Sequence, residues 1–259
     1  TVSRISGSSE AARRSSSGAS ASRCSAPTAH TPHERSQGSS LAMSACTAMA
    51  IAASDVDEDV CLGHLRTLAA AAEAQGSYLW IDMEDSSYVD RTLDLYQWLR
   101  ASHGNTGICL QAYLRRTAKD IERLLPLGPA IRLVKGAYDE PKDVAFKSKK
   151  EVDANYLGLA VTMLRESRTR SMRVGLGTHD VDLIEQIAVH AAAAGVSKDA
   201  FEVQMLYGIR AKEQRRLARS GYKVQTLIAY GDAWYRWYMR RLAERPANVV
   251  FAMRQMLPW

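Results

Sequence analysis

The sequence of 259 residues lacks several features that would mark a membrane, metal or disulfide protein. No uninterrupted apolar run approaches the roughly 20 residues of a membrane span, which excludes an integral membrane protein. The four cysteines show no CxxC spacing, so neither a zinc site nor a disulfide framework is indicated and a reducing compartment is the default. The six histidines lack HxH and HxxxH spacing, so we expect no metal site.

Two common catalytic and nucleotide-binding motifs are also absent. No GxGxxG fingerprint follows an early strand-like segment, which disfavours an open dinucleotide-binding sheet. No serine lies in a GxSxG motif, which disfavours an esterase-type nucleophile. The composition, 46% hydrophobic and 24% charged, is that of a soluble globular protein long enough for one large domain.

The N-terminal stretch differs from the rest of the chain. It is rich in Ser, Ala and Arg, contains no lysine and has no apolar periodicity before about residue 42. We therefore expect residues 1–52 to be disordered or unrelated to a folded domain that spans residues 53–259. Because this stretch carries about half of the net charge of +6, the charge is weak evidence for a nucleic-acid partner, and none is expected. The predicted location is the cytoplasm, or the mitochondrion if residues 1–40 are a transit peptide.

From residue 53 onward, strand-like apolar runs alternate with amphipathic helical patterns. The predicted helices span residues 60–74, 88–102, 151–166, 181–194 and 211–220, with a short one ending at 124, and the predicted strands span residues 78–83, 107–114, 130–135, 172–176, 201–205 and 222–228. This alternation predicts parallel strands covered by helices. A closed barrel needs eight strands, and residues 43–52 could supply one poor strand at best. The predicted fold is an α/β, (βα)8 TIM-type barrel that is incomplete at its N-terminus.

Polar side chains gather in or just after the six predicted strands, where barrel enzymes place their chemistry. They are Asp82, Glu84 and Asp85; Gln111 and Tyr113; Arg132, Lys135 and Tyr138; Thr178, His179 and Asp180; Gln204 and Tyr207; and Tyr230. Purely structural roles are the alternative interpretation. Asp82 and Glu84 could cap a helix or form salt bridges, and Thr178 or Asp180 could be the N-cap of a helix. Arg132 is harder to explain in this way, because a guanidinium inside an apolar strand needs an anion or hydrogen-bond acceptors, which a bound ligand could supply.

The segment at residues 230–251 combines aromatic and cationic side chains. If it is helical, Trp237 and Arg241 share one side, and Arg240 projects about 100° away from Arg241. Two guanidiniums can hold one carboxylate or phosphate from two directions. An ordinary amphipathic helix with surface arginines is the competing interpretation.

Six motifs occur in order: IDMED (81–85), LQAYLRR (110–116), RLVKGAYDEP (132–141), THD (178–180), FEVQMLYGIR (201–210) and YGDAWYRWYMRRLAERPAN (230–248). Together they resemble the monofunctional bacterial proline dehydrogenases, which are FAD-dependent flavoproteins built on a distorted (βα)8 barrel. The resemblance runs from about residue 55 to the C-terminus. It implies oxidation of L-proline to Δ1-pyrroline-5-carboxylate in proline catabolism, with electrons passed to a quinone and peripheral association with the inner face of the membrane.

The resemblance also implies roles for individual residues of this sequence. Asp82 and Arg132 match active-site positions, with Arg132 near the flavin N5. The positions that match contacts of FAD are Met83, Gln111, Lys135, Gly136, Ala137, Tyr138, Thr178, His179, Gln204 and Glu244. The positions that match the proline pocket are Leu206, Trp237, Arg240 and Arg241, with the arginine pair holding the carboxylate.

Two departures from the family pattern leave alternatives open. The family has a lysine on an early strand, whereas the first lysine here is Lys119, and Trp237 stands where the family commonly has tyrosine. An incomplete, catalytically impaired homologue is therefore one alternative. A Schiff-base aldolase that uses Lys135 is another, from a different enzyme class.

Overall fold

The computed structural model describes residues 46–48 and 58–228, all of which belong to one unit that spans Ala42–Trp259. Strands and helices alternate through these residues. The strands are β1 (Cys46–Ala48), β2 (Leu79–Ile81), β3 (Thr106–Gln111), β4 (Ala130–Val134), β5 (Arg173–Gly177), β6 (Glu202–Leu206) and β7 (Lys223–Leu227). The helices are α2 (Glu58–Ala74), α3 (Val89–Ser102), α4 (Thr117–Leu124), α5 (Lys149–Glu166), α6 (Val181–Ala193) and α7 (Ala211–Arg219), with short 3-10 turns η1 (Ser86–Tyr88) and η2 (Leu125–Leu127).

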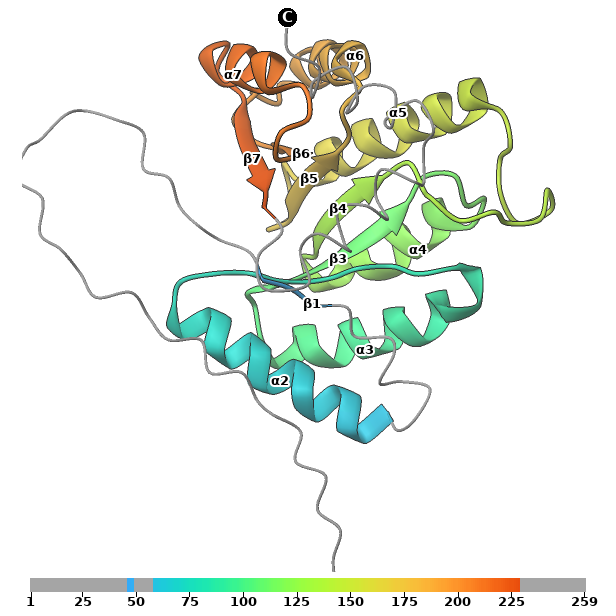
Figure 1. The fold of residues 1–259 in the computed structure, drawn as a ribbon, viewed down its shortest axis with the longest axis vertical. Coiled ribbons are helices and arrows are strands. Elements are labelled where there is room, and N and C mark those ends of the chain that lie inside the picture. The colour runs from blue at the N-terminus through green and yellow to red at the C-terminus, as the bar shows by residue number, and fades with distance from the viewer. Residues whose placement is uncertain (1–45, 49–57, 229–259) are drawn as a thin grey trace, which may run out of the picture. The chain divides into compact units, whose positions relative to one another are not determined.

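The seven strands form one sheet in which spatial order follows chain order and every neighbouring pair is parallel. Figure 1 shows the sheet curling through the successive strands, with the helices alternating along it. This singly wound order is that of a (βα) barrel wall, because each crossover returns the chain to the next strand in the same direction. Within residues 46–48 and 58–228, no pairing joins β7 to β1. The predicted incomplete α/β barrel is confirmed.

Six of the strands coincide with predicted ones, and β1 lies inside the segment for which only a poor strand was expected. Its three residues pair with β2 in parallel register, Cys46 with Leu79 and Ala48 with Ile81. The predicted boundary near residue 52 is not tested by these elements and stays a prediction.

The two faces of the sheet differ in chemistry, and the difference follows from the two-residue period of a strand. On β4, β5 and β6, alternate side chains are fully or almost fully buried and apolar; they are Ile131, Leu133, Val174, Leu176, Val203 and Met205. These residues pack with the apolar residues of the helices in one core. The other face, here called the inner face, carries Arg132, Arg173, Glu202 and Gln204 on the same strands.

Local signals in the sequence fix where the helices around the candidate site begin. Ser148 and Glu151 form a capping box at the start of α5: the Ser148 side chain accepts from the Glu151 backbone N–H, and the Glu151 carboxylate reaches back to residue 148. Asp180 caps α6 by accepting from the Leu183 N–H at 3.3 Å. None of the described helices is both long and apolar enough to cross a bilayer.

Candidate functional site

The centre of the candidate site is Arg132, in the middle of β4 on the inner face. Its Nη1 donates to Asp82 Oδ1 at 3.1 Å, and its Nε donates to Gln204 Oε1 at 2.7 Å. The Arg132 side chain is only 11% exposed, so these partners satisfy a cation that burial would otherwise penalise. Within the described residues, the second terminal nitrogen, Nη2, makes no hydrogen bond. The guanidinium is therefore held from two sides with donor capacity left over.

Residues from three strands meet here because parallel register aligns them. Arg132 pairs with Gly175 on β5, and Gly177 pairs with Gln204 on β6. Asp82 follows the last residue of β2 and continues the inner face of that strand. The predicted pair of active-site residues, Asp82 and Arg132, is thus brought together by geometry, although 50 residues separate them.

Beneath this centre, the inner face is filled by Trp80. Its ring is fully buried and lies 4.7 Å from the Arg132 guanidinium and 5.7 Å from that of Arg173. Gly107, the register partner of Trp80 on β3, makes room for the ring, since a Cβ there would lie 2.6 Å from two ring carbons. Arg173 is neutralised by Glu202, whose Oε1 accepts from Nε at 2.8 Å and lies 2.7 Å from Nη2.

Gln111 and Met83 form a third part of the inner face. Gln111 is buried and donates weakly to the Met83 carbonyl at 3.5 Å, while its Oε1 has no hydrogen-bond partner within the described residues. A buried amide oxygen without a partner is a position where a ligand donor would be favourable. The neighbouring Cys109 is unreactive at neutral pH, because burial, assisted by the Asp82 carboxylate, raises the pKa of its thiol to about 12.

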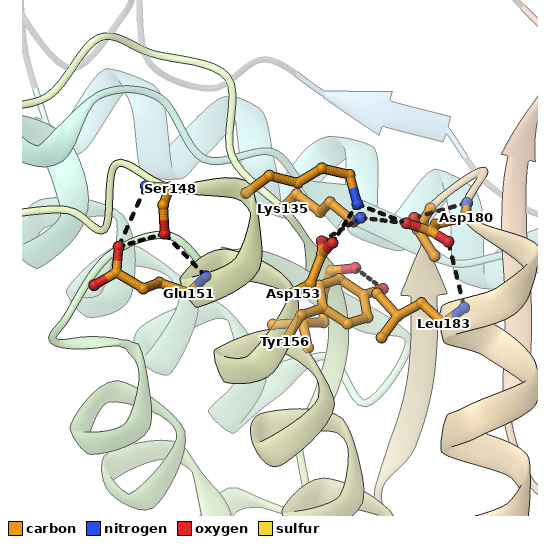
Figure 2. A network of polar contacts seen from close by, with 10 residues as sticks. Lys135, Ser148, Glu151, Asp153, Tyr156, Asp180 and Leu183 are labelled. Carbon is orange, nitrogen blue, oxygen red and sulfur yellow. Dashed lines mark hydrogen bonds and ion pairs between the residues drawn. The ribbon is translucent and has the colours of Figure 1, made fainter.

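Lys135 lies in a cluster with Asp153 and Asp180, as Figure 2 shows. Its Nζ donates to Asp153 of α5 at 2.5 Å and to Asp180, the N-cap of α6, at 2.8 Å. Lys149 contacts both carboxylates from the solvent side. The ammonium of Lys135 is therefore engaged by the helices that cover the sheet, through its ion pairs with Asp153 and Asp180.

The two aspartates of this cluster are held in their charged form. Burial acts to raise the pKa of Asp153, but the hydrogen bonds from Lys135 and Lys149 outweigh it, and the pKa lies below its ordinary value. The pKa of Asp180 is also lowered: burial acts to raise it, but the hydrogen bonds from Lys135 and the Leu183 N–H, together with the charges of Lys135 and Lys149, outweigh burial. The cluster is a salt-bridge network that ties the end of β4 to two helices.

The turn after β4 shapes a shallow groove of about 370 Å³ beside Lys135. Gly136 has a φ of +113°, and a Cβ on it would lie 2.1 Å from the Tyr113 ring, so this position requires glycine. Tyr113 and Tyr138 both line the groove. Ala137 and Tyr138 are exposed, and the Tyr138 hydroxyl is hydrogen-bonded to the Glu84 carboxylate.

The turn after β5 contains Thr178 and His179. Thr178 is buried, and its hydroxyl accepts from the Asp180 N–H at 3.1 Å. The Nε2 of His179 accepts from the backbone N–H of Leu206 at 3.3 Å, which links this turn to the end of β6. The N-cap alternative is correct for Asp180, and it leaves the ring of His179 half-buried at the edge of the inner face.

Five residues of the predicted site lie outside the described residues: Tyr230, Trp237, Arg240, Arg241 and Glu244. In the other direction, sequence reasoning missed Trp80, Arg173, Glu202 and Asp153. Trp80 and Glu202 could have been found from the two-residue period of their strands, since they share a face with Asp82 and Gln204 respectively. Arg173 reaches this face only through the register of β4 with β5. No local signal marks Asp153, which joins Lys135 only through the packing of α5.

A family model described as "Proline dehydrogenase" matches residues 3–254 of the chain. The chain belongs to the proline dehydrogenase family. It is 39% identical over 202 residues to proline dehydrogenase 2 of Bacillus subtilis subsp. natto, a match that covers 78% of this chain and 65% of that protein. It is 41% identical over 202 residues to a proline dehydrogenase of Deinococcus radiodurans, with 77% and 64% covered.

A solved structure gives the same family relationship at the level of the fold. It is proline utilization A (PutA) from Bdellovibrio bacteriovorus inactivated by N-propargylglycine, with a TM-score of 0.66 and 26% identity over 74% of this chain and 22% of that one. The chain spans slightly less than two thirds of the length of its proline dehydrogenase relatives. The barrel wall of this chain is therefore similar in fold to that structure.

Proposed function

We propose that this chain is an FAD-dependent proline dehydrogenase that oxidises L-proline to Δ1-pyrroline-5-carboxylate. The observation that carries the proposal is the Asp82–Arg132–Gln204 group on the inner face, in a chain that belongs to the proline dehydrogenase family. When bound, FAD would supply the acceptor for the hydride that leaves the proline ring. We propose a quinone as the final electron acceptor and peripheral association with the membrane as the setting for that transfer.

The residues of the inner face fit a flavin. Arg132 is a cation with remaining donor capacity, and a positive charge beside a flavin stabilises the reduced, anionic ring. Gln111 adds a buried acceptor without a partner in the described part of the chain. We propose that these residues, with Met83, Gln204 and His179, hold the isoalloxazine.

The roles of the other residues follow from their environments. Arg240 and Arg241 would fix the carboxylate of proline, which converts hydride transfer into a positioned, unimolecular event. Leu206 and Trp237 would form the apolar wall of that pocket. Lys135 would act through structure, because its two salt bridges place the Gly136–Tyr138 turn over the end of the sheet.

The Schiff-base alternative has less support than the dehydrogenase. A lysine nucleophile must present a free amine to a carbonyl group, whereas the Nζ of Lys135 contacts two carboxylates at 2.5 and 2.8 Å. Attack would require both salt bridges to break. Borohydride trapping with a carbonyl substrate should therefore leave Lys135 unmodified.

The proposal is tested with the purified full chain. We expect flavin bands in its visible spectrum, bleaching of these bands when L-proline is added without oxygen, and no bleaching with D-proline. R132M should slow the bleaching by about 10²–10³, as expected for loss of a positioned charge donor. R170M is the matched control, because Arg170 is a surface arginine that pairs with Glu166. A colourless protein that takes up no FAD, or a flavin that proline does not reduce, would refute the proposal.

A further inference from the structure

On the inner face, a continuous chain of hydrogen bonds and ion pairs runs from Arg132 toward the N-terminal ends of β5 and β6, where Arg173 and Glu202 lie. Gln204 accepts from Arg132 Nε through its Oε1 and donates from its Nε2 to Glu202 Oε2 at 3.0 Å. Glu202 in turn is bound by Arg173 through its other oxygen. From this geometry we infer that Glu202 is a positioning residue that fixes Arg132 indirectly, by dictating which way the Gln204 amide points. The functional part of this inference rests on the proposed role of Arg132.

The Gln204 side chain ends in an amide, which can point in either of two orientations. A glutamine side chain has an acceptor oxygen and a donor NH2 of nearly equal shape, so packing alone does not decide between its two orientations. Only the orientation with the oxygen toward Arg132 is favourable, because the other would direct an NH2 group at a guanidinium, which has donors and no acceptor. Arg132 itself favours this orientation, so what matters is whether the group on the other side of the Gln204 amide selects the same one.

Glu202 is the group that can make this selection. A carboxylate is an acceptor only, so it requires the NH2 of Gln204 and thereby sends the oxygen of the amide to Arg132. Gln225 also accepts from Gln204 Nε2, at 3.3 Å, but it is an amide that can itself be reversed. The Glu202 bond is the shorter of the two and is charge-assisted, so it dominates.

The surroundings fix Glu202 and Gln204 in place. Glu202 is only 13% exposed, and two nitrogens of Arg173 hold its Oε1, which leaves Oε2 for Gln204. Arg173 lies over the Tyr78 ring at 4.1 Å. Gly175 provides the space for the amide, since a Cβ there would lie 2.8 Å from Gln204 Nε2.

The test uses the full chain without added cofactor, so that it does not depend on activity. The Nε–H of Arg132 gives a nitrogen-15 NMR signal that is assigned by its loss in R132K. In E202Q, the new amide can give its oxygen to Arg173 and its NH2 to Gln204, which then turns its own NH2 toward Arg132. We expect hydrogen exchange of the Arg132 Nε–H to accelerate by about tenfold, as expected for loss of one charge-assisted hydrogen bond.

Three further variants separate positioning from simple destabilisation. E185Q is the matched control, because Glu185 pairs with Arg216 on the surface, and it should leave the exchange rate unchanged. Q204L removes the link while keeping the Glu202–Arg173 pair, and it should accelerate exchange as E202Q does. The exchanged pair E202Q/Q204E should restore slow exchange, because the carboxylate at position 204 accepts from Arg132 and the amide at position 202 can donate to it.

The outcomes distinguish this inference from the proposed function. Unchanged exchange in E202Q or Q204L, or no recovery in E202Q/Q204E, would overturn the inference even if proline reduces the flavin. The expected exchange rates in a protein that proline does not reduce would support the positioning of Arg132 and refute the proposed function alone. In an active protein, E202Q should lower the rate of flavin reduction more than it weakens proline binding.

Discussion

Replacing Lys135 by methionine gives a direct measure of the salt-bridge network at the end of β4. Breaking a buried pair costs about 3–5 kcal/mol, because a charge is left without its partner. Asp153 and Asp180 are 23% and 26% exposed, and Lys149 still contacts both, so water and this lysine compensate in part. We expect K135M to lose roughly 1–3 kcal/mol at neutral pH. For a domain of this size, that corresponds to a fall in Tm of about 2–12 °C.

The pH dependence of the same variant has a definite sign. The pKa values of Asp153 and Asp180 are lowered in the folded state, so their contribution to stability is present above the pKa of the unfolded chain, about 4. It is lost as the pH falls through the lower, folded-state pKa. Because K135M removes the hydrogen bond from Lys135 to each carboxylate, the Tm difference between wild type and variant should shrink below pH 4.

Thermal unfolding followed by circular dichroism between pH 3 and pH 7 measures both effects. K212M is the control, since Lys212 is an exposed lysine of α7, and its Tm should follow that of the wild type at every pH. An unchanged Tm for K135M at pH 7, or a difference that stays constant down to pH 3, would contradict the assignment of Lys135 to this network.

Two further predictions concern glycine positions and the inner-face ion pair. G136A should lower the free energy of unfolding by about 2–5 kcal/mol, because the φ of +113° is strained for alanine and the Tyr113 ring blocks its Cβ. G158A in α5 is the control: its Cβ meets nothing within 4 Å, and it should raise the free energy of unfolding by about 0.5–1 kcal/mol. Urea unfolding compares the two variants, and equal midpoints would contradict the role given to Gly136. R173M/E202M should keep a free energy of unfolding in urea within about 1 kcal/mol of the wild type, since replacing a buried ion pair by apolar groups is often neutral. The same variant should accelerate hydrogen exchange of the Arg132 Nε–H. A large loss of stability would show that the pair is structural.

The order and type of the elements were predictable because two periodicities alternate clearly in this chain. The run 130–135 is a nearly continuous apolar segment, typical of a buried parallel strand, that one arginine interrupts, and that arginine lies at the centre of the inner face. The predicted helix at 151–166 begins two residues earlier in the structure, because the capping box of Ser148 and Glu151 sets its first turn. Strand β1 was the weakest prediction, since three residues carry little periodic signal.

The site was predictable only in part, because sequence spacing gives faces and ends but no partners across the sheet. Asp82 and Arg132 were identified through family motifs, and their contact depends on the register of β2, β3 and β4. Lys135 follows Arg132 by three residues, yet its partners come from α5 and the cap of α6. An odd number of residues along a strand reverses the face, so Lys135 continues the side of Leu133, toward the helices.

The energetics of the inner face support positioning as its main role. Arg132, Asp82, Arg173 and Glu202 are two cations and two anions that alternate along one polar chain, so the group is neutral as a whole. The desolvation of such groups offsets most of their mutual attraction, and an apolar set of the same volume would stabilise a barrel at least as well. Their benefit is geometric: each donor has an acceptor that fixes its direction, as Gln204 does for Arg132. A guanidinium held at Nε and Nη1, with Nη2 making no bond in the described part of the chain, is oriented before any ligand arrives.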